Sequence, residues 1–212
     1  MAMKLYCFGE SGNSYKAALT MTLAGVEWVP VFVNFFHGDA RSPEFRALNE
    51  MGEVPVLRDG DEVLTQSGLI QYHIAEKTGK LLPQDHHLRQ EVMRWVLWDN
   101  HKMSSQAGTL RFLMNFVPEE KRPQEVIRWL SGRLRDAFKV LDAHLEGRDF
   151  IVDDVPSLAD TACCGYLYYP EPFTFDRKAW PNIDRWLDNV AALPGWKHPY
   201  DMMPGRPSDR GL

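Results

Sequence analysis

The sequence predicts an α/β domain followed by an all-helical domain, and two observations support this division. Strand-like and helix-like segments alternate over residues 1–80. Over residues 88–212 strand patterns nearly vanish and apolar residues recur at helical spacing. Residues 81–87, between the two, include Pro83 and have the composition of a linker. A chain of 212 residues is long enough for two domains that share an interface.

The first half of the α/β domain has the pattern strand, helix, strand. Residues 5–8 form a short apolar strand, and residues 15–24 follow as a helix that Gly25 ends. A mostly apolar stripe on one face of this helix supports the assignment. Residues 28–33 are β-branched and aromatic, which is typical of a buried strand.

The second half of this domain adds a helix, a hairpin and a last helix. Ser42-Pro43-Glu44 supplies a serine cap, a proline at the first helical position and an acid near the positive end of the helix. Residues 54–57 and 62–64 flank the turn Asp59-Gly60-Asp61, which predicts a hairpin. A helix over residues 68–78 completes the order βαβαββα, which matches a thioredoxin-like domain.

The second domain reads as helices throughout. The clearest helix covers residues 124–146 and has one apolar face. Ser157 and Asp160 form a capping box that opens a further helix. Another helix begins at Pro181, and the proline- and glycine-rich tail after Pro199 is expected to be extended.

Composition and charge exclude several classes of function. A net charge of −5 argues against a nucleic-acid-binding surface, and no apolar run reaches the ~20 residues that cross a bilayer. The chain begins without the pattern of a secretory signal, so we expect a cytoplasmic protein. Its three cysteines, Cys7, Cys163 and Cys164, have no spacing that suggests a disulfide framework or a zinc site, and we expect no metal.

Three short motifs carry a resemblance to a known family. They cover residues 11–16 (SGNSYK), residues 52–57 (GEVPVL) and residues 66–68 (QSG). In this order and spacing they resemble the amino-terminal domain of the cytosolic glutathione transferases, in the bacterial, serine-type form with a theta-, zeta- or phi-like motif. The Ser157/Asp160 box resembles the cap of that family's buried core helix. The resemblance implies an α/β glutathione-binding domain and a helical domain that shapes the pocket for a second substrate.

Catalysis in such an enzyme depends on the ionisation of the glutathione thiol. A free thiol has a pKa of about 8.5, and lowering it by about two units needs roughly 2.7 kcal/mol. A hydrogen-bond donor and the positive end of a helix can supply this stabilisation together. Ser11 lies just before a predicted helix, and the resemblance implies that it donates to the sulfur. Asn13, Ser14 and Tyr6 are rival donors, and Ser11 could instead be only a helix cap.

The resemblance also implies contacts that bind the tripeptide. The backbone groups of Val54 would pair with the cysteinyl part of glutathione if the Val54–Pro55 bond is cis. The alternative is a trans proline at the edge of the sheet. Gln66 and Ser67 stand at the entrance of a helix and would hold the γ-glutamyl end, and Ser67 is also expected to cap this helix. Arg41 would reach the glycine carboxylate, unless it is a solvated surface residue. Asn13, in the same turn as Ser11, is also expected to bind glutathione as a hydrogen-bond donor.

The leading hypothesis is therefore a glutathione transferase that attacks an electrophilic, mostly apolar second substrate. The resemblance implies a homodimer that uses glutathione as co-substrate and needs no other cofactor. Two alternatives stay open. Ala40 and Glu53 stand where relatives carry residues that favour the glycine carboxylate, which would fit a non-catalytic interaction protein. A donor role for Asn13 would suit a glutathione-dependent disulfide reductase or peroxidase. The second substrate leaves no motif in the sequence.

Overall fold

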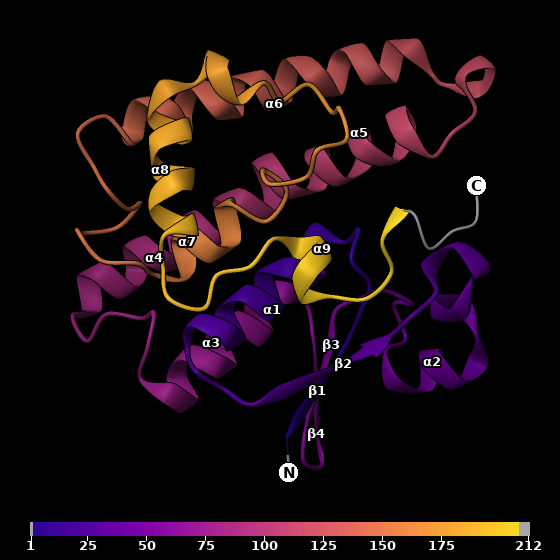
Figure 1. Ribbon diagram of the computed structural model, residues 1–212, viewed down its shortest axis with the longest axis horizontal. Coiled ribbons are helices and arrows are strands. Elements are labelled where there is room, and N and C mark those ends of the chain that lie inside the picture. The colour runs from indigo at the N-terminus through magenta and orange to yellow at the C-terminus, as the bar shows by residue number, and fades with distance from the viewer. Residues whose placement is uncertain (1, 208–212) are drawn as a thin grey trace. The chain divides into compact units, whose positions relative to one another are not determined.

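The computed structural model describes residues 2–207 and divides into two compact units (Figure 1). The first unit contains the chain up to Leu82 together with the described residues from Pro194 on. The second unit is Pro83–Leu193. This division differs from the expected one at the C-terminal end, where residues 194–207 belong to the α/β unit. We call residues 194–207 the return segment.

The first unit has the predicted order of elements, βαβαββα, and this confirms the predicted fold class. Most boundaries differ by one to three residues from those expected, the largest shift being at the first helix, which begins at Gly12 and not near residue 15. Two 3-10 helices, Phe35–His37 and Asp39–Arg41, lie between the second strand and the second helix. The elements are β1 (Met3–Cys7), α1 (Gly12–Leu23), β2 (Trp28–Phe32), α2 (Pro43–Leu48), β3 (Val56–Asp59), β4 (Glu62–Thr65) and α3 (Ser67–Thr78).

The register of the sheet brings four strand ends to one edge. The strand order is β2-β1-β3-β4, with β1 parallel to β2 and antiparallel to β3, and β3 antiparallel to β4. Cys7 pairs with Phe32, while Val56 pairs with both Tyr6 and Thr65. The carboxyl ends of β1, β2 and β4 therefore meet the amino end of β3. We call this edge, formed by Cys7, Phe32, Val56 and Thr65, the motif edge.

The two faces of the sheet are covered by different helices. Side chains alternate between the faces of a strand, and the paired residues Leu5 and Leu57 are fully buried. The helices α1 and α3 pack together, with Gln71 Nε2 donating to Thr20 Oγ1 at 3.0 Å. Figure 1 shows α2 on the opposite side of the sheet from α1 and α3.

The strand β2 is an edge strand, and the prediction of a buried strand at residues 28–33 is wrong. Val29 and Phe32 are exposed, and no residue of β2 is fully buried. A strand with only one neighbour leaves its other side open to solvent. The aromatic and β-branched composition fits an exposed edge as well as a buried centre, so composition alone could not separate the two.

The second unit is helical, as predicted. Asp85 caps its first helix by accepting hydrogen bonds from the N–H groups of His87 and Leu88, so this helix begins inside the expected linker. The apolar face predicted for residues 124–146 is buried along α6. The helices are α4 (His86–Trp98), α5 (Ser105–Asn115), α6 (Gln124–His144), α7 (Leu158–Cys163) and α8 (Pro181–Ala191), with a π-helical turn at Asp99–Ser104.

The predicted capping box is present and extends into a buried network. Asp160 has no exposed surface and accepts hydrogen bonds from Ser157 N at 2.8 Å and Ser157 Oγ at 3.0 Å. It also accepts from Ile151 N at 2.9 Å and from the indole of Trp186 at 2.8 Å. Burial raises the pKa of this carboxyl, while the four donors lower it. Asp160 therefore joins the start of α7 to α8 and to the preceding loop.

The return segment contains a short helix, α9 (Pro199–Met202), where an extended tail was expected. Pro199 occupies the first helical position, and the imidazole of His198 accepts from Tyr200 N at 3.3 Å. Such a start allows one helical turn within a proline-rich stretch. Among residues 2–207 no helix combines the length and the apolar character that crossing a bilayer would require.

Candidate active site

The three sequence motifs meet at the motif edge of the first unit. The loop that carries Ser11 follows β1, the Val54-Pro55 pair precedes β3, and Gln66-Ser67 follows β4. Both α1 and α3 begin at this edge, because each follows a strand that ends there. The amino ends of two twelve-residue helices, with their unpaired N–H groups and positive dipole ends, thus lie at one edge of the sheet. This arrangement favours an anionic ligand.

Ser11 is the N-cap of α1, where its hydroxyl oxygen accepts from Ser14 N at 3.1 Å. Ser11 as a whole residue is only 8% exposed. A hydroxyl has two acceptor lone pairs and one donor proton. Capping uses one lone pair and leaves the proton available for a thiolate. The capping role and the donor role of Ser11 are therefore compatible, where the sequence had presented them as alternatives.

Asn13 and Ser14 differ in their access to a ligand. Asn13 is half-buried, and its Oδ1 atom is buried with no hydrogen-bond partner among the described residues. Ser14 has no exposed surface, and its Oγ atom also lacks a partner within residues 2–207. A donor must touch the sulfur, so the surroundings of Ser14 would have to move first. Asn13 is the stronger rival to Ser11.

Tyr6 lies on the face of the sheet that α2 covers, opposite the face that α1 and α3 cover. Its ring contacts that of Phe45 edge to face, with centroids 6.4 Å apart. It packs with Val54 against a buried cluster that includes Val33 and Val56. This environment favours the interpretation of Tyr6 as a core residue and not as a thiol donor.

The Val54–Pro55 peptide bond is cis, as the resemblance implied. Pro55 is buried and Val54 is half-buried. Among the described residues, no hydrogen bond is made by the backbone N–H or C=O of Val54. Those two groups are therefore available to pair with the backbone of a peptide ligand.

A residue that sequence reasoning missed holds the loop before Val54. Asn49 is almost fully buried, and its Nδ2 atom donates to Glu53 O at 2.7 Å. Its Oδ1 atom accepts from Met51 N at 3.1 Å. Gly52 has a φ of +65°, and a Cβ there would lie 2.9 Å from Ala40 O. An asparagine after a helix is a weak sequence signal, since only the folded loop shows that both ends of its amide are used.

Gln66, and not Ser67, is the N-cap of α3. Gln66 is exposed with a φ of +68° and makes no side-chain capping bond. A non-glycine residue with positive φ is uncommon, and such residues cluster at ligand sites. Ser67 is the first helical residue and only 8% exposed. Its hydroxyl is not used as a cap, which differs from the expectation that it would serve both purposes.

The residues expected near the glycine carboxylate are less well defined. Arg41 is exposed at the end of the second 3-10 helix. Ala40 is buried in the cluster around Phe45, where a small side chain fits. Glu53 is exposed, so solvent can accommodate its carboxylate away from a ligand. The assignment of Arg41 as a glutathione contact stays a prediction.

The three cysteine thiols are buried. Burial raises the pKa of the Cys7 thiol to about 12. Cys163 and Cys164 lie in and just after α7 with almost no exposed surface. Buried cysteines with little thiolate character are poor nucleophiles, so these three side chains are interpreted as packing residues.

A second polar cluster lies at the hairpin end of the sheet, away from the motif edge. Asp59, Glu62 and His73 have potential ligand atoms within 4.8 Å of one another. The ammonium of Lys77 lies 2.5 Å from Asp59 Oδ2, and His73 Nε2 lies 3.0 Å from the same oxygen. Because Lys77 would repel a cation, we interpret the group as an ion-pair network.

This network predicts a contribution to acid sensitivity. The hydrogen bond from Lys77 lowers the pKa of the Asp59 carboxyl, and that from His73 adds to the effect. A lowered pKa in the folded state stabilises the protein above the unfolded value of about 3.9, and this stability is lost as the pH falls through the folded value. We expect Asp59→Asn to reduce the acid-induced loss of unfolding free energy by about 0.5 to 1 kcal/mol, since Lys77 is half exposed. Urea unfolding at neutral and acid pH measures this, with the hairpin-tip variant Asp61→Asn as control. Equal acid sensitivity of both variants would contradict the assignment.

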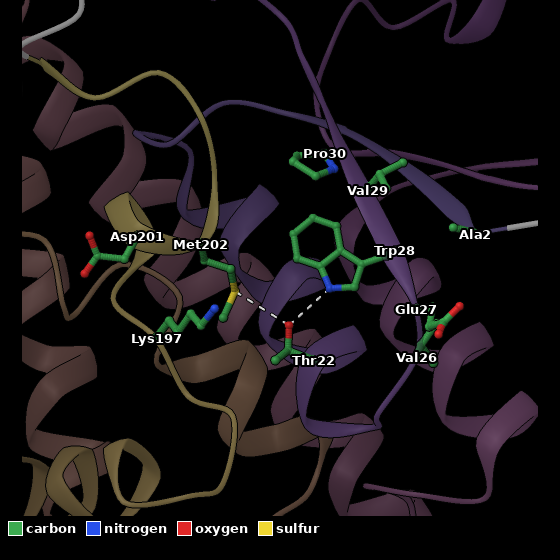
Figure 2. Close-up of a pocket in the computed structure, with 10 residues that line it drawn as sticks. All are labelled: Ala2, Thr22, Val26, Glu27, Trp28, Val29, Pro30, Lys197, Asp201 and Met202. Carbon is green, nitrogen blue, oxygen red and sulfur yellow. Dashed lines mark hydrogen bonds between the residues drawn. The ribbon is translucent and has the colours of Figure 1, made fainter.

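A pocket of about 560 Å³ lies elsewhere in the first unit. Figure 2 shows Trp28 near the centre of the view, Thr22 below it, and Met202 and Lys197 of the return segment to the left. Trp28 begins β2, whereas the motif edge is at Phe32, about 13 Å along the strand. This pocket is therefore separate from the site of the three motifs.

Comparisons with known proteins agree with the geometry. Residues 1–76 match the family described as Glutathione S-transferase, N-terminal domain, and residues 106–194 match Glutathione S-transferase, C-terminal domain. The chain is 30% identical over 207 residues to a maleylacetoacetate isomerase from Pseudomonas aeruginosa, covering 93% of this chain and 96% of the relative.

Solved structures show the same similarity. A glutathione S-transferase from Xanthobacter autotrophicus is 31% identical and covers all of both chains, with a TM-score of 0.87. A glutathione transferase from Burkholderia graminis, with two glutathione molecules bound per subunit, is 27% identical over 92% of this chain and 85% of that one, with a TM-score of 0.83.

The α/β unit, the helical unit and the three motifs at one edge of the sheet together define the class of protein. The chain belongs to the glutathione S-transferase family, which confirms the family, the fold class and the enzyme class predicted from the sequence.

Proposed function

We propose that this transferase activates the thiol of glutathione at the motif edge, with Ser11 as the donor to the sulfur. One observation carries the proposal. Ser11, the free backbone groups of Val54 and the buried Ser67 lie at one edge of the sheet, where two helices begin. These are a donor for the sulfur, a pair of groups for a peptide backbone and a site for a carboxylate.

Each part of the tripeptide has a proposed partner in the first unit. The γ-glutamyl carboxylate accepts hydrogen bonds at the amino end of α3, from Ser67 and its neighbouring N–H groups. The cysteinyl residue pairs its backbone with Val54. This places the sulfur near Ser11 at the amino end of α1, and Arg41 is proposed for the glycine carboxylate.

The reaction follows from the stabilised thiolate. The thiol loses its proton to solvent, and the Ser11 hydroxyl donates a hydrogen bond to the sulfur anion. A sulfur lone pair then attacks the electrophilic carbon of the second substrate, and the leaving group departs with its bonding electrons. The product is a thioether. Holding both reactants in one orientation contributes the rest of the acceleration.

The second substrate, the assembly and the location belong to the same proposal. The helical unit is expected to shape the pocket for a mostly apolar electrophile, and the protein is expected to act as a homodimer in the cytoplasm. Similarity to a maleylacetoacetate isomerase favours a second candidate, in which glutathione adds to an unsaturated substrate and is released after isomerisation. Disulfide reduction by two glutathione molecules is a further alternative, supported by the two-glutathione relative.

Calorimetric titration with glutathione tests the site. We expect Ser67→Ala to weaken binding about tenfold or more, because it removes a hydrogen bond to a charged carboxylate, worth about 1.5 to 3 kcal/mol. Thr78→Ala, at the other end of α3, is the control and should bind like the wild type. If the wild-type protein does not bind glutathione, the proposed site at the motif edge is wrong.

A further inference from the structure

The return segment brings the C-terminal part of the chain against the elements that carry Ser11. Tyr15, a buried residue in the first turns of α1, donates its hydroxyl to Lys197 O at 2.9 Å. Thr22, near the end of α1, lies 4.0 Å from Met202 Sδ and accepts from the indole of Trp28, as Figure 2 shows. The return segment therefore packs against α1 both near its first turns and near its end.

Beyond α9 the segment reaches the loop that precedes Ser11. Gly9 N donates to Pro204 O at 2.5 Å. The approach is close, since a Cβ on Gly9 would lie 2.8 Å from Gly205 O and 3.2 Å from Pro204 O. Gly9 stands two residues before Ser11, and Ser11 N in turn donates to Phe8 O at 3.1 Å. The short loop over residues 8–11 is thus fixed from outside at Gly9 and from within at Ser11.

A second contact fixes the return segment itself at the motif edge. Gly205 has a φ of +85° and lies against the ring of Phe32, where a Cβ would be 2.5 Å from Cε2. Phe32 ends β2 and pairs with Cys7, the last residue of β1. The position of the Pro204 carbonyl is therefore tied to the same strand ends from which the Ser11 loop departs.

We propose that the return segment is a positioning element for the thiol donor, acting through the hydrogen bond from Gly9 to Pro204. This deepens the proposed function and rests on it, because positioning matters only if Ser11 donates to the sulfur. Residues about 190 positions apart in the chain would together set where the Ser11 hydroxyl points. A mutation distant from the reacting atoms can displace a catalytic group slightly, and such a displacement can lower the rate up to about a hundredfold.

Two variants displace the segment without touching Ser11. Gly205→Ala places a methyl group against Phe32, and a chain that ends at Met202 keeps α9 but removes Pro204. The control is Gly60→Ala at the hairpin tip, which also has positive φ, +62°, but has no neighbour within 4 Å of the added carbon. Thermal melting establishes that each variant is folded.

The readout is the pKa of the thiol of bound glutathione, followed by the ultraviolet absorbance of the thiolate, together with kcat/KM against pH. We expect both displacing variants to raise this pKa and to lower kcat/KM about tenfold at neutral pH, with a smaller loss at high pH. KM for glutathione should change little, because α3 still holds the γ-glutamyl end. Gly60→Ala should behave like the wild type.

Combination with Ser11→Ala separates this proposal from the proposed function. Gly205→Ala should add no further shift in thiol pKa once the Ser11 hydroxyl is absent. Folded displacing variants with a wild-type thiol pKa, or an equal shift in the Ser11→Ala background, would overturn the positioning role alone. If Ser11→Ala itself leaves the thiol pKa unchanged, the donor assignment fails, and the positioning role with it.

Discussion

Replacing Ser11 by alanine is expected to lower kcat/KM for glutathione conjugation about a hundredfold at neutral pH. The hydroxyl lies at the amino end of α1, where its oxygen accepts a hydrogen bond from Ser14 N. Its own proton therefore remains available to donate to the sulfur. Losing one preorganised donor to a developing or stabilised anion costs about 2.7 to 4 kcal/mol in comparable sites. The thiol of bound glutathione should then titrate near its free value of about 8.5.

The pH profile of kcat/KM and the thiolate absorbance of the bound ligand measure this effect. Ser11→Thr is the matched control, since it retains both the hydroxyl and the ability to cap. It should keep most of the activity, whereas Ser11→Ala should recover only as the pH approaches the free thiol pKa. An unchanged thiol pKa in Ser11→Ala would transfer the donor role to Asn13, whose side-chain amide can donate through Nδ2.

Asn13→Ala distinguishes the chemistries that remain open. If the enzyme conjugates electrophiles through Ser11, Asn13→Ala should lose much less activity than Ser11→Ala toward an aryl halide. A larger loss in Asn13→Ala, seen with a disulfide substrate, would instead support the disulfide reductase alternative. Equal tolerance of both substitutions would contradict the assignment of this loop.

Asp160→Asn is expected to reduce the free energy of unfolding by about 3 kcal/mol. The carboxylate is completely buried and accepts from four donors. An amide could still accept from Ile151 and Trp186 through Oδ1, but its NH₂ group would face the two donors of Ser157. Each buried group left without a partner costs about 1 to 3 kcal/mol, and the loss of two such hydrogen bonds accounts for the expected decrease in unfolding free energy. This is a large fraction of the 5 to 15 kcal/mol that stabilises a typical protein.

Urea or thermal unfolding measures the difference. Asp154→Asn, an exposed change of the same type in the loop before α7, is the control and should stay within about 0.5 kcal/mol. A melting temperature of Asp160→Asn equal to that of the control would show that the network around α7 contributes little. Glutathione affinity of the folded variant should be unaffected, since Asp160 belongs to the helical unit.

Local rules predicted the elements of the first unit, and the helices that begin near Gln124, Ser157 and Pro181, with small errors. Ser42 with Pro43, the hairpin turn at Gly60 and the Ser157/Asp160 box each contain their partners within a few residues, so they can be recognised without the fold. The errors fell where two local interpretations were possible. Ser67 could be a cap or the first helical residue, and the backbone of Gln66 made it the latter.

Within the site, the sequence supplied the residue types and the structure supplied their availability. Ser11, Asn13 and Ser14 can each donate a hydrogen bond, so the sequence does not choose between them. In the structure Ser14 has no exposed surface, whereas Ser11 and Asn13 have some. The environment of Tyr6 depends on which face of β1 it occupies, which alternation alone leaves open until the helices are placed. The support that Asn49 gives to the Val54 loop likewise appears only after folding.

The sequence by itself determined the order of the elements in the first unit, because helix caps, turns and hydrophobic periodicity act over a few residues. The family followed from the resemblance that the three motifs carry. The tertiary structure decided that β2 is an exposed edge and that residues 194–207 return to the first unit. It also decided that Pro204 meets Gly9 beside Ser11. Contacts between residues nearly two hundred positions apart depend on the register of the sheet and on close backbone approach, and neither of these leaves a local signal in the sequence.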